Sequence, residues 1–179
     1  MRVLDPTDLP HYTYDDYSQW QGRWELLDGI PHAMTPAPSI NHQRVSSKIA
    51  RLLEEALEGC DQCQALLPVD WKITEDTVVQ PDNLVVCYPP AGNYLTRAPS
   101  LIFEVLSSAT RHKDETIKFR LYETEGVRYY CLVDSEEKLI RIYKLNEGRY
   151  IKQTDAATET FNFDLTKCQI EFYCSRVWD

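Results

Sequence analysis

Short apolar runs alternate with two stretches of helical periodicity, and this alternation most limits the folds open to the chain. Between residues 41 and 57 apolar side chains recur every three to four positions, which predicts an amphipathic helix. Ser39 or Asn41 can cap its start, and Gly59 suits its end. A second helix is predicted over residues 114–125. The remaining apolar runs are short and rich in β-branched and aromatic residues, as is typical of strands.

The predicted strands surround these helices in an order that indicates one mixed sheet. Strands are expected at residues 23–27, 30–34, 65–72, 77–87 with a break at 81–83, 101–106, 129–134, 139–145 and 149–153, with one more apolar segment in the tail from Phe161. Asp28-Gly29 is a strong hairpin signal between the first two. The elements between Val45 and Asp134 run helix, three strands, helix, strand. We therefore expect an α/β or mixed α+β fold with an αβββαβ core and β-hairpins added at both ends.

Length and composition favour a single globular domain. The chain has 179 residues, of which 43% are hydrophobic and 26% are charged, close to the average for soluble globular proteins. We expect one domain over residues 1–179, with residues 1–22 as an N-terminal segment that leads into it. No apolar run approaches the roughly 20 residues that span a bilayer. The N-terminus also lacks the apolar core of a signal peptide, so we expect a cytoplasmic protein with no membrane partner.

The net charge of −9 limits the possible partners. It argues against broad, non-specific binding to DNA or to anionic lipid. It does not exclude a metal-dependent nuclease, because such an enzyme needs carboxylates at its centre and the metal offsets their charge. A local basic rim would then have to supply the phosphate contacts.

Six cysteines stand at positions 60, 63, 87, 131, 168 and 174. Without a secretory signal, all six are expected to be reduced and unpaired. Cys87 and Cys131 lie inside apolar runs and are expected in the core. Cys60 and Cys63 form a C-x-x-C motif, but no second such motif follows, and a zinc site needs four ligands. A structural zinc or redox site at Cys60 and Cys63 is therefore the weaker alternative.

Two carboxylates interrupt otherwise apolar strands. Asp82 follows Pro81 and precedes an apolar run, and Glu104 has apolar neighbours on both sides. A buried carboxylate is costly unless it is paired, protonated or bound to metal. Adjacent strands lie about 4.8 Å apart, so the two acids can face each other and offer oxygen ligands to Mg²⁺ or Mn²⁺.

A lysine follows in the second helix. Lys118 lies one turn beyond Asp114, and its ammonium would hold a nucleophilic water or a phosphate oxygen beside the two acids. The alternative without a functional role is that Asp82, after Pro81, is a turn residue and that Lys118, on a helix, is solvated. Glu104 resists that explanation because its run is apolar on both sides. Together, the three residues suit metal-assisted hydrolysis of a phosphodiester.

These segments match a known family in their order and spacing. The chain resembles the Uma-type restriction endonucleases, a branch of the PD-(D/E)xK nuclease superfamily that was long labelled a domain of unknown function. The matching segments are residues 24–29, the helix that contains His42, residues 80–82, residues 103–107, Lys118 and residues 127–134. The resemblance covers roughly residues 23–145, most of the chain, and implies a restriction-endonuclease-like fold.

The resemblance also implies a site and its cofactor. Asp82 and Glu104 would bind Mg²⁺ or Mn²⁺, with the carbonyl of Val105 as a further ligand. The usual superfamily lysine stands two residues after the glutamate, where this chain has Leu106. The family moves its lysine onto the following helix, and Lys118 is the match.

Three softer candidates remain open. His42 is a recurrent family position that would contact metal-bound water or a phosphate, and a hydrogen-bonded histidine near a helix end is an equal alternative. Glu25 can face the same cleft, although a solvent-facing strand carboxylate is favoured two to one, as an approximate prior for exposed glutamates. Gln80 either orients a carboxylate or ends a strand.

The implied function is a Mg²⁺- or Mn²⁺-dependent DNA endonuclease with catalytic residues Asp82, Glu104, Lys118 and His42. Its partner would be DNA as substrate, and a homodimer is expected because many restriction-type nucleases meet each strand with one site. The alternative is a catalytically inactive nuclease-like fold that acts as a nucleic-acid-binding or regulatory module. The acidic net charge and Leu106 favour that alternative somewhat.

Overall fold

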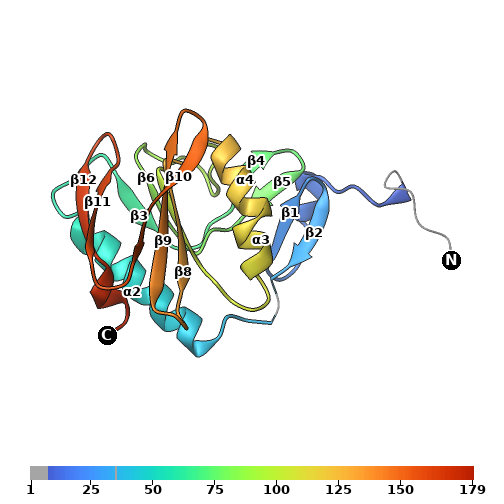
Figure 1. Cartoon of the computed structure of the whole chain (residues 1–179). Helices are drawn as coiled ribbons and strands as arrows, with labels where there is room; N and C mark the ends of the chain where they lie inside the picture. Colours follow the sequence, from blue (N-terminus) through green and yellow to red (C-terminus); the bar gives the residue numbers. More distant parts are fainter. Residues whose placement is uncertain (1–7, 35) are drawn as a thin grey trace.

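A six-stranded mixed sheet forms the centre of the fold (Figure 1). The computed structural model describes residues 8–34 and 36–179, and in it these strands lie in the order β10-β9-β8-β7-β6-β3. Their bounds are β3 (Gln64–Leu66), β6 (Asn83–Val86), β7 (Leu101–Val105), β8 (Tyr129–Asp134), β9 (Leu139–Asn146) and β10 (Arg149–Ala156). Only β7 and β8 run parallel; the other neighbours are antiparallel. A parallel pair needs a crossover, which α3 (Arg111–Glu115) and α4 (Ile117–Thr124) provide.

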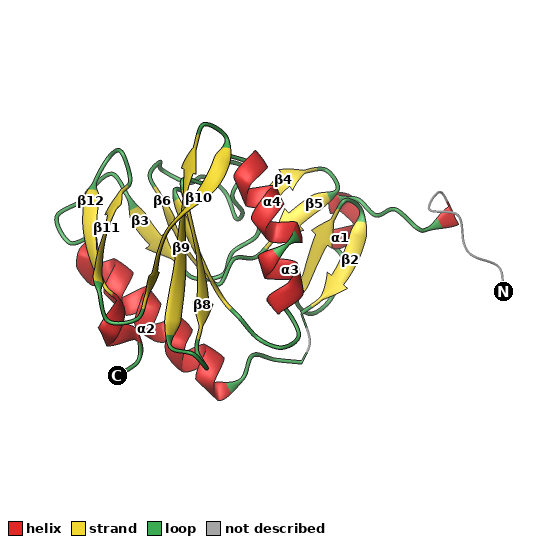
Figure 2. Cartoon of the chain, viewed as in Figure 1, coloured by secondary structure: helices red, strands yellow, loops and turns green. Residues whose placement is uncertain are grey.

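A second sheet, of four strands, lies on the side of α3 and α4 that faces away from the central sheet, to their right in Figure 2. Its order is β2-β1-β5-β4, from β1 (Trp24–Leu27), β2 (Ile30–Ala33), β4 (Trp71–Thr74) and β5 (Thr77–Val79). The short helix α1 (Tyr14–Tyr17) precedes it, and Tyr17 packs into its core with Leu26 and Val78. Residues 1–7 of the predicted N-terminal segment lie outside the described residues.

The central sheet is covered on both faces, which explains its nearly continuous apolar strands. On one face, helix α2 (Ile40–Ala56) packs with the hairpin of β11 (Thr160–Asp164) and β12 (Gln169–Tyr173) over Phe103 and Val105. On the other face, Ile102 and Leu106 pack with Tyr122 of α4. Side chains alternate along a strand, so Glu104 lies on the face toward α4.

The predicted αβββαβ order is confirmed in the central sheet: α2, β3, β6, β7, the α3–α4 crossover and β8 occur in this order, with β4 and β5 of the second sheet inserted between β3 and β6. The predicted strand over residues 65–72 was wrong as one element, because the chain leaves the central sheet at Leu67-Pro68 and β4 joins the other sheet. The second predicted helix begins earlier, at Arg111, and is interrupted at Thr116 (φ −125°, ψ −71°). The tail forms the β11–β12 hairpin and the 3₁₀ helix η2 (Cys174–Val177).

The Asp28-Gly29 turn requires positive φ at both residues, 49° and 74°, as a two-residue hairpin turn of type I′ does. A Cβ on Gly29 would also overlap the ring of His11. Gly29→Ala should therefore lower the free energy of unfolding by more than Gly148→Ala. Gly148 occupies the equivalent place in the β9–β10 turn, after Glu147 (φ 49°), and nothing lies within 4 Å of its Cβ position.

Urea unfolding of the two glycine variants separates the causes of destabilisation. The strained φ alone typically costs about 1–3 kcal/mol and applies to both variants. The additional loss in Gly29→Ala measures the contact with His11. Equal losses in the two variants would mean that His11 moves aside freely.

The expectation of six free thiols was wrong for four of the cysteines. Disulfides join Cys60 to Cys168 and Cys63 to Cys87, across 108 and 24 residues of sequence. Residues 63 and 87 stand next to the pair Gln64–Val86 of β3 and β6, so the sheet register places them opposite each other. Cys87 is therefore bonded at the sheet edge and only half-buried, whereas Cys131 is a free, buried core residue as predicted. Cys174 is also free and buried.

Within residues 8–34 and 36–179, no helix is both long and apolar enough to cross a membrane.

Candidate active site

The register of β6 and β7 brings the two predicted acids together. Asn83 pairs with Phe103, and one further step along this antiparallel register places Asp82 opposite Glu104. The backbone N–H of Asp82 lies 3.4 Å from Oε2 of Glu104, and the N–H of Val105 donates to Oδ2 of Asp82 at 2.8 Å. The two carboxylates therefore share one end of the strand pair, as the apolar runs around them predicted.

Lys118 reaches the same place from α4 and is almost completely buried. Its Nζ lies 2.9 Å from Oε1 of Glu104, 2.7 Å from Oε1 of Glu25 and 3.7 Å from Oδ1 of Asp114. Burial lowers the pKa of Lys118, but the carboxylates of Glu104, Glu25 and Asp114 more than reverse this and hold it well above its usual range. Lys118 is therefore an ammonium that donates hydrogen bonds.

Glu25 belongs to this cluster, so the favoured expectation of a solvent-facing carboxylate was wrong. Its side chain is fully buried, its Oε2 accepts from Nζ of Lys113 at 2.6 Å, and its Oε1 accepts from the backbone N–H of Gln80 at 3.0 Å. Burial raises the pKa of Glu25, but Lys118 and Lys113 outweigh this and lower it to about 2. The side chain of Gln80 donates to Asp70 at 2.6 Å, so Gln80 orients a carboxylate other than Asp82.

Two neighbours of the site were not identified as site residues from the sequence. Tyr122 donates its hydroxyl to Oε1 of Glu104 at 2.9 Å, and Asp114 is buried beside Lys118. The spacing of Asp114, Lys118 and Tyr122 at four-residue intervals is the signal that they share a helix face, although the break at Thr116 bends that face.

The charges of the cluster do not balance. Among the described residues, four carboxylates, those of Glu25, Asp82, Glu104 and Asp114, meet the two ammonium groups of Lys113 and Lys118 and the imidazole of His42. Burial raises the pKa of Glu104; Lys118 lowers it, and the other three carboxylates raise it again, leaving it well above its usual range. Burial likewise raises the pKa of Asp114 to about 6. Such an excess of buried carboxylate is relieved by protons or by a divalent cation.

His42 stands at the start of α2 with its ring in the site. Ser39 caps the helix by accepting from the N–H of His42 at 3.1 Å, and Nε2 of His42 lies 3.1 Å from Oδ2 of Asp82. Burial lowers the pKa of His42, but the hydrogen bond and charge of Asp82 raise it above its usual value. Its Nδ1 is buried and has no hydrogen-bond partner among the described residues. The structure thus shows His42 as a histidine hydrogen-bonded near a helix end and in contact with Asp82, while its contact with metal-bound water or a phosphate stays a prediction.

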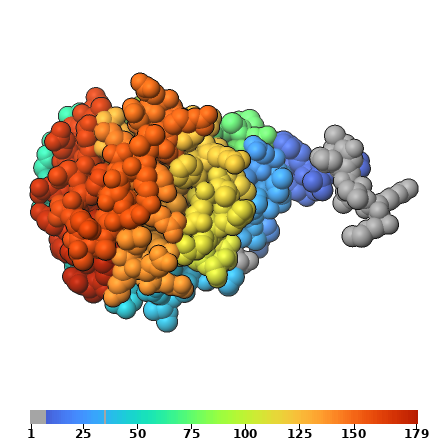
Figure 3. Space-filling view, viewed as in Figure 1, coloured from blue at the N-terminus to red at the C-terminus, as the bar shows by residue number. Residues whose placement is uncertain are grey.

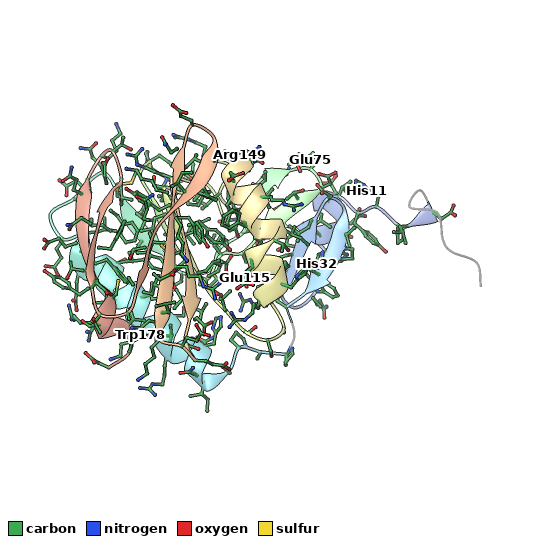
Figure 4. All side chains as sticks on the ribbon, in the orientation of Figure 1. His11, His32, Glu75, Glu115, Arg149 and Trp178 are labelled. Carbon is green, nitrogen blue, oxygen red and sulfur yellow. A yellow bond between two sulfur atoms is a disulfide. The ribbon has the colours of Figure 1, made fainter. Side chains whose placement is uncertain are left out.

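A pocket of about 680 Å³ opens onto these residues. Asp82, Glu104 and Lys118 line it, with the 107–114 segment on one wall and the β2 strand and the segment that follows it on another. Basic side chains also line the pocket: Arg23, His32, His112 and Lys113. Figure 4 labels His32 on β2, and Figure 3 shows α3 and α4 in yellow beside that hairpin in blue. The pocket therefore combines an acidic floor with basic groups at its wall.

The donor set fits Mg²⁺ or Mn²⁺. Both ions prefer oxygen ligands, and Asp82 and Glu104 supply carboxylate oxygens. The N–H of Val105 points to Asp82, and in an extended strand the carbonyl of the same residue points the same way. The carbonyl of Val105 therefore lies on the side of the two acids. Oε1 of Glu104 is engaged by Lys118 and Tyr122, which leaves Oε2 on the side of Asp82.

Comparison with known proteins places the chain in a nuclease context. Its sequence matches the Uma2 family, described as "Putative restriction endonuclease", over residues 14–170. An uncharacterized protein of Synechocystis sp. is 31% identical over 149 residues, which cover 78% of this chain and 77% of that protein. A crystal structure from Anabaena variabilis, described as a putative nuclease belonging to DUF820, superposes with a TM-score of 0.75 at 16% identity. It covers 93% of this chain and 97% of that one, so the two share their fold.

Proposed function

Because this chain belongs to the Uma2 family of restriction-endonuclease-like proteins, we propose that it is a Mg²⁺- or Mn²⁺-dependent endonuclease that hydrolyses phosphodiester bonds in DNA. The observation that carries the proposal is the unbalanced cluster of four carboxylates and two ammonium groups at the floor of a pocket with basic walls. A structural ion-pair network with this excess of acid would have to take up protons, whereas a bound divalent cation would compensate the charge directly.

In this proposal Asp82, Glu104 and the carbonyl of Val105 hold the cation. When bound, the cation supplies positive charge at the scissile phosphate and lowers the pKa of water. The ammonium of Lys118 is fixed by Glu25 and Glu104, so it donates to the attacking water or to a phosphate oxygen rather than acting as a base. His42, with its Nδ1 unpartnered among the described residues, holds Asp82 in place through Nε2. Arg23 and Lys113 at the pocket wall neutralise the DNA backbone.

The position of Lys118 also bears on the alternative of an inactive module. Leu106 stands where most members of the superfamily carry a lysine, which favours lost catalysis. The ammonium of Lys118 lies 2.9 Å from Glu104. Helix α4 therefore supplies a lysine beside this glutamate, although position 106 does not. This supports a migrated lysine and an active site.

A cleavage assay with a metal series tests the proposal. Purified protein is incubated with supercoiled and linear DNA in Mg²⁺, Mn²⁺, Ca²⁺ or a chelator, while calorimetry follows metal binding. We expect nicking or linearisation with Mg²⁺ or Mn²⁺ and none with chelator. Metal binding without cleavage across a broad DNA panel would favour the binding-module alternative. If the protein shows no metal binding and no cleavage, both the proposed site and the proposed function are contradicted.

The homodimer belongs to the same proposal, because in a dimer each strand of a duplex would meet one site. Light scattering with and without DNA measures it. A monomer bound to DNA would be expected to nick one strand only.

A further inference from the structure

Four cysteines from separate parts of the chain meet at the end of α2 remote from the acid cluster. Cys60 and Cys63 follow α2, Cys87 follows β6, and Cys168 lies in the β11–β12 turn. His42 stands at the opposite end of the 17-residue helix, which is about 25 Å long. In the structure the four sulfurs are joined as the pairs Cys60–Cys168 and Cys63–Cys87.

The two pairs are not independent of each other. The sulfurs of Cys60, Cys63 and Cys168 all lie within 4.8 Å of one another, and Cys87 is bonded to Cys63. Among the described residues, no other three cysteine, histidine or acidic side chains bring their ligand atoms so close together. Two separate disulfides need no such contact between pairs. The sulfur of Cys87 is not one of these three, so it would have to move closer, once its bond to Cys63 is reduced, to complete a metal site.

We propose that, when the chain is reduced, these four cysteines bind one Zn²⁺ ion as a tetrathiolate site. In a tetrahedral site with Zn–S distances of about 2.3 Å, sulfurs lie about 3.8 Å apart, which the approach of Cys60, Cys63 and Cys168 already allows. The C-x-x-C motif gives the first two ligands. The fold supplies the two that the motif lacked, Cys87 from the sheet edge and Cys168 from the C-terminal hairpin.

The backbone around the sulfurs suits a metal site. The N–H of Cys60 donates to the carbonyl of Leu57 at 2.9 Å, which turns the chain at the end of α2, and residues 61–62 form a second turn before Cys63. At the hairpin, the N–H of Leu165 donates to the carbonyl of Cys168 at 2.8 Å. Both cysteine segments are tight turns beside the edge of β3 and β6. One ion there would tie α2, the central sheet and the β11–β12 hairpin together.

The chemistry requires that both disulfides are first reduced. Each disulfide takes up two electrons from a water-soluble phosphine and two protons from water to give two thiols, and the oxygen of that water ends in the phosphine oxide. Zn²⁺ then replaces the thiol protons, which are released to solvent. Binding therefore weakens as the pH falls.

Cobalt substitution tests the site directly. The intact protein is reduced with the phosphine without oxygen, stripped of metal, and titrated with Co²⁺ and then Zn²⁺. We expect one equivalent of Co²⁺ to produce the visible bands of a tetrahedral ion and sulfur-to-cobalt charge transfer in the near ultraviolet, and both signals to disappear on adding one Zn²⁺. Metal analysis of protein purified under reducing conditions should find one zinc.

Variants separate this site from the other cysteines and from the acid cluster. Cys60→Ser and Cys168→Ser should each weaken Zn²⁺ binding at least about 100-fold, since losing only a hydrogen bond to a metal ligand already costs about 10- to 100-fold. Cys131→Ala and Cys174→Ala, which change the two free buried cysteines, should keep one Co²⁺ and its spectrum. Asp82→Asn should keep them too, because it alters only the acid site.

Three results would overturn the proposal. The first is that the reduced, folded chain shows the four thiols of this cluster on titration but binds neither Co²⁺ nor Zn²⁺. The four cysteines would then form two purely structural disulfides. The second is an unchanged cobalt spectrum in Cys60→Ser. The third is a spectrum without sulfur charge transfer. Circular dichroism of each variant shows that it is folded before its metal binding is compared.

Discussion

Asp82→Asn and Glu104→Gln should each reduce metal-dependent DNA cleavage on the order of 10³-fold. Each change replaces a charged oxygen ligand with a neutral amide of the same shape, so the cation and the charge that stabilises the transition state are lost together. Both changes should also weaken Mn²⁺ binding. The folded state should tolerate them, because removing one of four crowded carboxylates relieves repulsion when no metal is present.

Asp70→Asn provides a matched control for the same chemical change. Asp70 accepts from the hydroxyl of Tyr17 at 2.9 Å and from Nε2 of Gln80 at 2.6 Å, and it does not line the pocket. Single-turnover cleavage, Mn²⁺ titration and melting temperature should all stay near wild type in this variant. If wild type, Asp82→Asn and Asp70→Asn cut DNA at equal rates, the activity comes from a contaminating nuclease and the site is wrong.

The sequence was enough to predict the order of elements in the central sheet. Buried strands such as Leu101–Val105 appear as apolar runs that only Glu104 interrupts, and α2 shows a clear helical period. It was not enough to predict which sheet each strand joins. The run at 65–72 looked like one strand because apolar residues continue on both sides of Pro68, although a proline can mark a break. Nothing in the run tells that β3 pairs with β6 and β4 with β5.

Only part of the candidate site could be predicted from the sequence, again because contacts between distant segments leave no local signal. Glu104 stood out because a charge inside an apolar run needs a partner. Glu25 did not, because its strand WELL also fits a strand with one face in solvent, and its partner Lys113 lies 88 residues further along the chain. The disulfide partners Cys60 and Cys168 were hidden in the same way, by 108 residues of separation. Contacts between residues far apart in the chain are set by topology, which single-residue patterns do not encode.

Glu25→Gln should lower the free energy of unfolding at pH 7 by about 3 kcal/mol, although Glu25 is not one of the proposed metal ligands. Its carboxylate is fully buried and contacts Lys118 at 2.7 Å and Lys113 at 2.6 Å. A neutral amide leaves both ammonium groups with less compensation and removes the fixed partner of Lys118. Urea unfolding at pH 7 measures the loss, and slower cleavage should accompany it because Lys118 is then less firmly placed.

The pH dependence distinguishes this ion pair from a simple packing defect. The pKa of Glu25 is lowered from 4.5 to about 2 on folding, so its stabilising effect is complete above pH 4.5 and disappears as the pH falls toward 2. The difference in free energy of unfolding between wild type and Glu25→Gln should therefore become smaller as the pH falls from 4.5 toward 2. Glu75→Gln is the control, because Glu75 is labelled on the surface in Figure 4 and pairs with Lys72 at the same 2.6 Å while 75% exposed. It should change stability little at any pH, because exposed pairs contribute little. If the free energy of unfolding lost in Glu25→Gln stays constant from pH 7 to pH 2, the effect comes from packing. That result would contradict the inference that a buried, charged Glu25 holds Lys118 in place.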